Sequence, residues 1–369
     1  MSFPHTVSQV ELDSMLLQAH NDANYHPDFE GCTFPKGLDL KGREFHGANL
    51  KYCKFQGDDY QHVHFSGANM EQATFEKGAN LSYAKFNGTD LRQVDFKEVN
   101  LSNASFIDTK FNLNNFESSN LDGTIIRSNI QCTIFTSSDL RKTNFNGSYV
   151  PNGEQGAEFN HSNLEGNTNL KMNATELFIT KCNLKGVDLS GANLSGGAGG
   201  NYTQIHDSNL EGANLRGANL YRVELYGVNL TNANCEGAQL GDSMIRNVTA
   251  HGANFTNAAF QKAEIEANLN EGSRGLNPAG AEFRDNDYWT SSWKGVSWDN
   301  IIPADQSSGT ATVPHVAGQK PKGHHVHHRV ETAGEPIAGR MHEHSHHHQP
   351  HVVPVQQNGI AHAPRPGMV

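Results

Sequence analysis

A large apolar residue recurs at every fifth position over most of this chain, and the residue two positions before it is usually small. Neither the 3.6-residue period of a helix nor the two-residue period of a strand produces this spacing. The large residue, here called the central residue, shares one side of a short extended segment with the small one. The other residues of each repeat must turn the chain. The pattern therefore predicts an all-β solenoid whose stacked coils bury the central residues.

The repeats read Ala48-Asn49-Leu50, Ala68-Asn69-Met70, Ala213-Asn214-Leu215 and Ala253-Asn254-Phe255. From about Phe29 to Phe283 the chain resembles the pentapeptide-repeat family, whose repeats follow A(D/N)LXX. The resemblance implies a right-handed quadrilateral β-helix of about 12 coils and ~60 Å, with four repeats per turn. Residues twenty apart would then stack. This places Phe45 beneath Phe65, Phe55 beneath Phe75, and Leu81 beneath Leu101 and Leu121.

The Asn or Asp before the central residue recurs too regularly for a catalytic site, and we expect it to hydrogen-bond turn backbone. Relative to the five-residue period, the chain has one extra residue between Phe75 and Leu81 and lacks one between Leu121 and Ile130. These departures predict bulges or kinks. Two longer Gly-rich breaks, Asn146–Glu158 and Ser195–Gln204, are expected to protrude as loops. Such loops either carry function on the rigid scaffold or are inert interruptions.

Both ends of a solenoid need a cap. Ser8 and Glu11 form an S-x-x-E capping box, and the apolar residues that follow predict a helix over 8–21 that covers the first coil. A membrane-surface or partner-binding helix is the alternative. At the other end, Tyr288, Trp289, Trp293 and Trp298 either cover the last coil or form a binding surface. We therefore divide the chain into a capping helix (1–27), a repeat domain (28–302) and a tail (303–369).

The tail replaces the repeat with Pro, Gly, Val and His, a composition that predicts disorder. It holds 12 of the 21 His residues and a net charge of +1. Clustered imidazoles can chelate divalent transition metals and gain charge below pH ~6.5. We expect unselective metal binding at most, and no other cofactor. The candidate ligands are His324, His325, His327, His328, His342, His344, His346, His347 and His348.

The whole chain carries a net charge of −11, and the part outside the tail carries −12. This negative charge argues against direct nucleic-acid binding. No apolar run approaches the ~20 residues of a membrane span, and no secretory signal is visible. Five Cys residues stand without paired spacing, which indicates small buried side chains in a reducing compartment. We expect a cytoplasmic protein or, alternatively, a cargo that a bacterial secretion system exports into a host cell.

No nucleophile–base pair, metal cage or phosphate loop is present in the sequence, so we do not expect an enzyme. His62 and His64 alternate along one predicted strand, but no Asp, Glu or Cys accompanies them at metal-site spacing, and we expect solvated surface histidines. The predicted function is a protein-interaction rod or scaffold, and the resemblance adds secreted effectors that act by protein contact. The alternative is a DNA mimic that modulates a type II topoisomerase such as gyrase. The sequence identifies neither the partner nor the oligomeric state.

Overall fold

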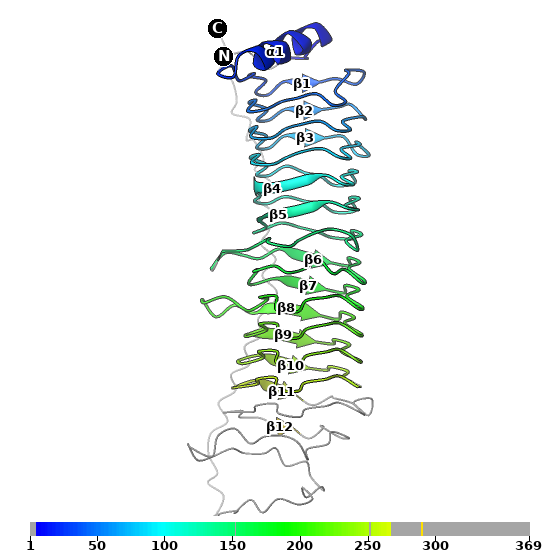
Figure 1. Cartoon of the computed structure of the whole chain (residues 1–369), viewed down its shortest axis with the longest axis vertical. Coiled ribbons are helices and arrows are strands. Elements are labelled where there is room, and N and C mark those ends of the chain that lie inside the picture. The colour runs from blue at the N-terminus through cyan, green and yellow to red at the C-terminus, as the bar shows by residue number, and fades with distance from the viewer. Residues whose placement is uncertain (1–4, 152, 251, 267–288, 291–369) are drawn as a thin grey trace, which may run out of the picture. The chain divides into compact units, whose positions relative to one another are not determined.

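The computed structural model describes residues 5–151, 153–250, 252–266 and 289–290, all within the first of two compact units, Met1–Lys322. These residues form one N-terminal helix followed by a β-solenoid of about 11 turns (Figure 1). All strand pairings in them are parallel, and most join residues about twenty positions apart. The elements are α1 (Gln9–Asn21), β1 (Thr33–Phe34), β2 (Lys54–Phe55), β3 (Thr74–Phe75), β4 (Ser105–Lys110), β5 (Ile125–Asn129), β6 (Glu158–Asn160), β7 (Phe178–Thr180), β8 (Thr203–His206), β9 (Val223–Tyr226), β10 (Met244–Arg246), β11 (Glu264–Glu266) and β12 (Trp289–Thr290).

Each repeat closes with a tight turn whose geometry explains the five-residue period. In the repeat centred on Leu50, the amide of Cys53 donates to the Leu50 carbonyl at 3.1 Å, and Tyr52 between them has φ 61°. This left-handed residue marks a turn of type II character. The outward-facing residues form the turn and change the direction of the chain. The central and small residues both face inward. Successive coils then pair through backbone hydrogen bonds, and Leu50 itself donates to the Asn69 carbonyl at 2.7 Å.

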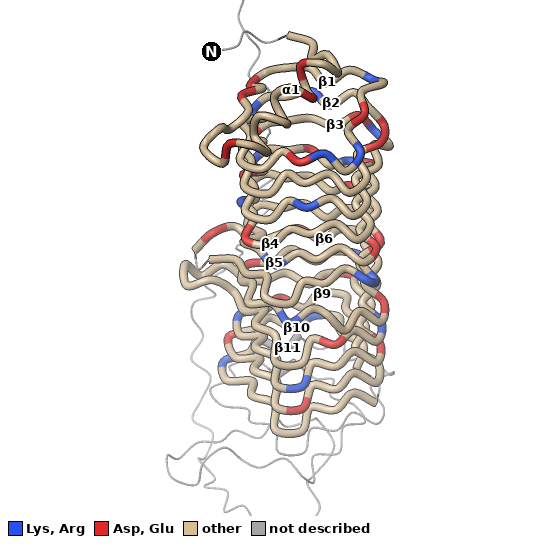
Figure 2. The backbone as a smooth tube through the Cα atoms, turned by 45° about the horizontal axis from the view of Figure 1, so that its top comes forward, with Lys and Arg blue, Asp and Glu red and all other residues tan. Residues whose placement is uncertain are grey.

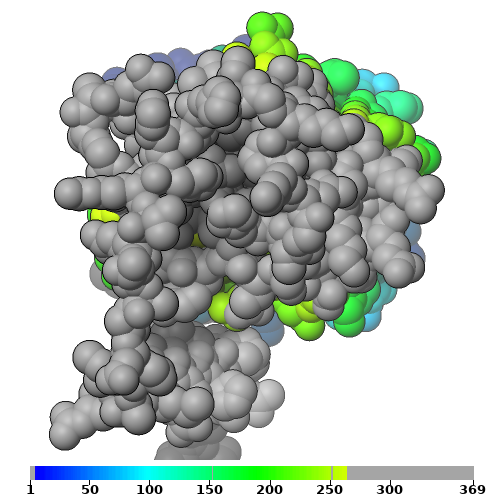
Figure 3. Space-filling model, turned by 90° about the horizontal axis from the view of Figure 1, so that it is seen from below, coloured from blue at the N-terminus to red at the C-terminus, as the bar shows by residue number. Residues whose placement is uncertain are grey.

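The central residues form four columns, and aromatic rings predominate in two columns on opposite faces of the first coils, with Ile126 standing between Phe106 and Phe145 in one of them. Ring centroids of Phe45 and Phe65 lie 5.3 Å apart in one column, and those of Phe55 and Phe75 lie 4.8 Å apart in the other. The two columns also meet across the interior, because Phe55 and Phe65 contact edge to face at 5.8 Å. Such pairs stabilise by ~0.5–1.5 kcal/mol beyond their area burial. Seen from below, green atoms of later coils lie in front of blue and cyan atoms of earlier coils around the rim (Figure 3).

A third column consists mainly of leucines. Leu81, Leu101 and Leu121 are fully buried, and the amides of Leu81 and Leu101 donate to carbonyls of the next coil at 2.7 and 2.8 Å. Beyond Phe159 the second aromatic column continues as aliphatic residues that pair in register: Ile179, Ile205, Leu225 and Ile245. This column therefore changes from aromatic to aliphatic along the axis, whereas Phe255 and Phe260 bring buried rings back near the end of the described coils. The right-handed winding stays a prediction.

The two short register breaks are absorbed without loss of stacking. After Phe75 the stacking step rises to 21 residues, so that Phe65 contacts Phe86 at 5.3 Å and Phe75 contacts Phe96 at 5.8 Å. Between β4 and β5 the register shifts after Ile107, where a bulge removes one residue from the step. The expected bulge is confirmed there, because a local backbone kink costs less than displacing whole columns of central residues.

The small inward position also accepts hydroxyl and thiol groups. Thr124 donates its hydroxyl to the Leu101 carbonyl of the preceding coil at 2.8 Å, and the Cys182 thiol reaches the Phe159 carbonyl at 2.9 Å. Burial raises the pKa of Cys182 to about 11 and that of Cys235 to about 12. Four of the five cysteines are buried as expected, whereas Cys132 is half-buried at a left-handed turn.

The Asn and Asp side chains before the central residues bind turn backbone, as the sequence predicted. The Oδ1 of Asn80 accepts the Ser82 amide at 3.1 Å, and the same geometry recurs at Asn49, Asp90, Asp95, Asp139, Asp188 and Asn193. Many of the Asn side chains also hydrogen-bond to one another from coil to coil and so form a ladder along the axis. Asn100 donates to Asn80 and accepts from Asn120, both at 3.0 Å.

The helix α1 forms at the predicted place. Ser8 caps it: its hydroxyl accepts the Glu11 amide at 3.2 Å, and the Glu11 carboxylate accepts the Ser8 amide at 3.4 Å. Leu12 is fully buried beside Val7, and Met15 and Leu16 pack partly against the same core. At the other end, β12 adds to β11 through the backbone pairing of Trp289 with Ile265. Tyr288, Trp293, Trp298 and the boundary at 302 lie outside the described residues.

Candidate functional sites on the solenoid surface

Acidic and basic positions are interspersed along the solenoid (Figure 2). Residues 5–266 carry 20 Lys and Arg and 30 Asp and Glu, a net charge of −10. Many acidic side chains pair with a basic one of a neighbouring coil, as in Lys51–Glu71 at 3.0 Å and Lys97–Glu117 at 2.8 Å. The hydrogen bond from Lys77 lowers the pKa of Glu98, and that from Lys36 lowers the pKa of Asp58. The described surface therefore has no continuous acidic stripe.

Two loops leave the solenoid on one side, at the levels of β6 and β8 (Figure 1). They are the expected Gly-rich breaks, and their exposed tips are Gly153–Gln155 and Ala198–Asn201. The coil between them passes through Glu176, and backbone hydrogen bonds tie this corner together: Glu176 donates to Ser195, and Gly196 donates to Tyr221. The expected protrusion of both breaks is confirmed, and they share one corner of the solenoid.

Glu176 anchors the second loop. The residue is 5% exposed. One of its carboxylate oxygens accepts from the side-chain amide of Asn201 at 2.9 Å, while the other has no hydrogen-bond partner among the described residues. Gly197 packs directly on this carboxylate, where a Cβ would overlap it. Arg222 holds the loop from the next coil by donating to the Gly197 carbonyl at 3.3 Å. These contacts give the loop a defined place on the rod.

Two exposed tyrosines flank the loops on the same corner. Tyr149 is 46% exposed and Tyr221 is 42% exposed, and the three coil steps between them separate them by ~15 Å along the axis. The Tyr221 hydroxyl donates to Asp242 at 2.7 Å, so its ring is held in place. We call the two loop tips, Tyr149 and Tyr221 the loop surface. Exposed aromatic rings beside polar loops that a rigid scaffold holds in place are typical of protein-contact surfaces.

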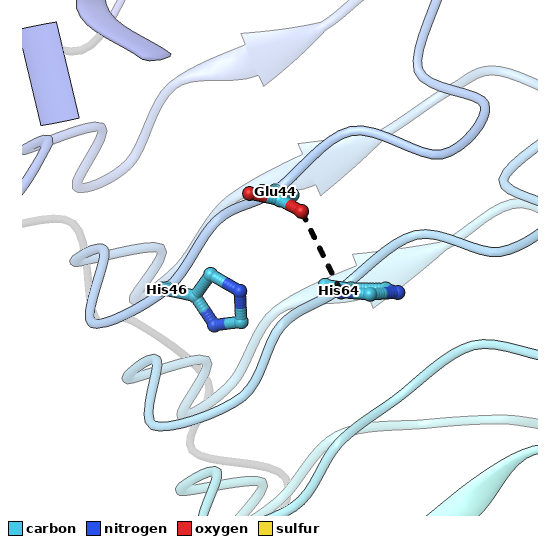
Figure 4. Close-up of side chains that lie close together, drawn as sticks. All are labelled: Glu44, His46 and His64. Atoms are coloured by element: carbon cyan, nitrogen blue, oxygen red, sulfur yellow. Dashed lines mark ion pairs between the residues drawn. The ribbon is translucent and has the colours of Figure 1, made fainter. Parts of the chain in front are cut away.

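A separate cluster of metal-ligating residues lies near the N-terminal end (Figure 4). Glu44, His46 and His64 hold one ligand atom each within 4.8 Å of one another. The Nδ1 of His64 is 4.0 Å from the Glu44 carboxylate, and the rings of His46 and His64 meet edge to face at 5.8 Å. Partial burial, then the charge of Lys85, lowers the pKa of His64, which favours the neutral imidazole that binds metals.

This cluster corrects the sequence-based interpretation of His64. A carboxylate and a second imidazole do accompany it, from the preceding coil rather than from neighbouring positions. His62 instead occupies a left-handed turn with φ 58°, and its ring stacks on Tyr83 at 4.8 Å. The twenty-residue register was the signal that could have found Glu44, since it places residue 44 beside residue 64. The nine predicted tail ligands, His324 to His348, lie outside the described residues.

The comparison with protein families decides the identity of the fold. A model described as the pentapeptide repeat region matches residues 27–106, and one described as pentapeptide repeats (8 copies) matches 91–127, 179–196 and 208–247. This chain is a pentapeptide-repeat protein. No curated protein matches it.

Several solved structures resemble this pentapeptide-repeat protein in fold. HetL, involved in heterocyst differentiation regulation in the cyanobacterium Nostoc, is 19% identical, with 74% of this chain and 97% of HetL covered and a TM-score of 0.28. Full-length QnrB1, a plasmid-mediated fluoroquinolone resistance protein, is 16% identical, with 69% and 93% covered and a TM-score of 0.22. The A-module of the mannuronan C-5 epimerase AlgE6 of Azotobacter vinelandii is 11% identical, with 76% and 90% covered and a TM-score of 0.27. At these values the likenesses carry no argument about what this chain binds.

In the described part of the chain, no helix combines the length and the apolar character that crossing a bilayer requires.

Proposed function

We propose that this pentapeptide-repeat protein is a non-enzymatic protein-interaction rod that engages a protein partner through the loop surface. The observation that carries the proposal is the convergence of both Gly-rich insertions and two exposed tyrosines on one corner. Elsewhere the repeats follow one another with little change. An insertion anchored by Glu176, Asn201 and Arg222 presents a fixed shape, which lowers the entropy lost on binding.

This proposal has two forms. The protein is either a secreted effector that acts by protein contact or a cytoplasmic scaffold. Both use the same rod and differ only in the compartment of the partner. Neither form requires a membrane span or a cofactor.

The alternative is a DNA mimic that modulates a type II topoisomerase. Duplex DNA carries one charge per ~1.7 Å, so a rod of about 11 coils and ~50 Å would need about 30 negative charges to match it. Residues 5–266 carry a net charge of −10, and cross-coil ion pairs intersperse the basic groups among the acidic ones. The charge magnitude and its distribution both favour the protein-interaction rod.

The test is affinity purification from cells with matched variants of the full chain. Tyr149→Ser together with Tyr221→Ser alters the loop surface. Tyr52→Ser together with Tyr83→Ser is the control, because these tyrosines are 42% and 50% exposed and lie in coils near the N-terminal end, away from the loop surface.

Proteins that wild type and control retain and the loop-surface variant loses would support the proposal. Equal recovery by all three would contradict it. Inhibition of gyrase supercoiling by the wild type, unchanged in the loop-surface variant, would favour the DNA mimic.

A further inference from the structure

We propose that Glu44, His46 and His64 form a binding site for a first-row divalent cation such as zinc. The three residues lie on adjacent coils and on one face (Figure 4). Two imidazoles and a carboxylate are the donor set that such ions take, with a fourth position left open to solvent or to a partner's side chain. The site is independent of the loop surface and of the proposed function.

The backbone beneath the site is rigid. Glu44 and His64 are register partners in the parallel ladder, where Phe45 donates to the His64 carbonyl at 2.7 Å and His64 donates to the Arg43 carbonyl at 2.9 Å. A ligand pair held on neighbouring rungs needs only side-chain rotation to bind. This distinguishes it from a run of histidines without fixed geometry.

The distances fit an ion after a small closure. Tetrahedral zinc with bonds of ~2.0–2.1 Å separates its ligand atoms by about 3.4 Å. The ligand atoms here lie within 4.8 Å of one another. Glu44 and His46 are exposed and His64 is half-buried, so rotation of the outer side chains meets little packing resistance.

One neighbour opposes the ion. Lys85, which carries a positive charge, is the register partner of His64 on the next coil. The same charge repels a bound cation across the rung spacing of ~4.8 Å. Removing it should therefore strengthen metal binding, an effect that a purely structural role for the three residues does not predict.

The experiment is a zinc titration of the full chain by equilibrium dialysis and calorimetry, with the histidine-rich tail present in every variant as a constant background. His46→Ala and His64→Ala should each lose one zinc equivalent or at least about tenfold in affinity, since even weaker outer-shell changes cost 10–100-fold. Glu44→Gln, which leaves both rings in place, should weaken binding in the same direction. Lys85→Gln should tighten it about threefold.

His62→Ala is the matched control, because it lies two residues from His64 but its ring stacks on Tyr83. Its zinc stoichiometry and affinity should equal those of the wild type. Far-UV circular dichroism of each variant checks that the solenoid is intact. Identical zinc binding in wild type, His64→Ala and Glu44→Gln would overturn the proposal, as would a loss in His62→Ala equal to that in His64→Ala.

Discussion

The aromatic columns should couple energetically between adjacent coils, and Phe86 with Phe106 provides the sharpest case. Their ring centroids lie 4.8 Å apart with planes 1° from parallel, and both side chains are fully buried. Phe→Leu at either position keeps an apolar central residue of the kind used elsewhere in the chain. Each single substitution should cost roughly 1–2 kcal/mol of unfolding free energy through lost contacts.

The double variant separates ring stacking from burial. If the stacked pair contributes ~0.5–1.5 kcal/mol beyond area, then Phe86→Leu with Phe106→Leu should cost less than the sum of the singles by that amount. Urea unfolding followed by circular dichroism measures all four free energies. The matched control combines Phe86→Leu with Phe145→Leu, in the same column but three coil steps and ~15 Å away. A coupling for Phe86–Phe106 no larger than the control coupling would refute the argument.

Three further predictions follow from other parts of the solenoid. Asn100→Ala removes three hydrogen bonds, to Asn80, Asn120 and the Ser102 amide, and should lower the unfolding free energy by about 1.5–3 kcal/mol, whereas an unchanged urea midpoint would contradict the ladder. Gly197→Ala places a methyl group against the Glu176 carboxylate and should cost about 1–3 kcal/mol and speed proteolysis at the second loop; cleavage at the wild-type rate would contradict the packing. The Cys182 thiol, whose pKa is raised to about 11 by burial, should resist alkylation at pH 8 until urea unfolds the chain. Because its folded pKa exceeds the unfolded one, its contribution to stability is full below pH ~8.5 and is lost as pH rises toward 11.

The period of five predicted the stacked arrangement because each repeat meets the same physical requirement. An apolar central residue must be inward, a small residue must share its side, and an Asn or Asp must accept the turn amide. Asn80 and Leu81 satisfy these requirements in the way their neighbours in the next coils do. The hydrogen bonds of the ladder therefore follow from the repeat itself.

Features that depend on two different coils were harder to predict. The residues next to His64 in sequence include no carboxylate, because its partners Glu44 and His46 lie about one coil away. The repeat pattern does not predict the burial of Glu176, because Gly197, which packs on its carboxylate, belongs to an insertion outside the period. Such sites arise where the regular register places unusual residues side by side, and they need the register as well as the sequence.

The central claim, that a protein partner contacts the loop surface, is tested most directly by site-specific photo-crosslinking in cells. One probe replaces Gly199, at the exposed tip of the second loop with open space around it, and a control probe replaces the exposed Lys110 on β4. The account predicts a discrete crosslinked protein from position 199 that is absent from position 110. Crosslinks of equal yield to the same protein from both positions, or none from position 199 while position 110 gives one, would contradict it.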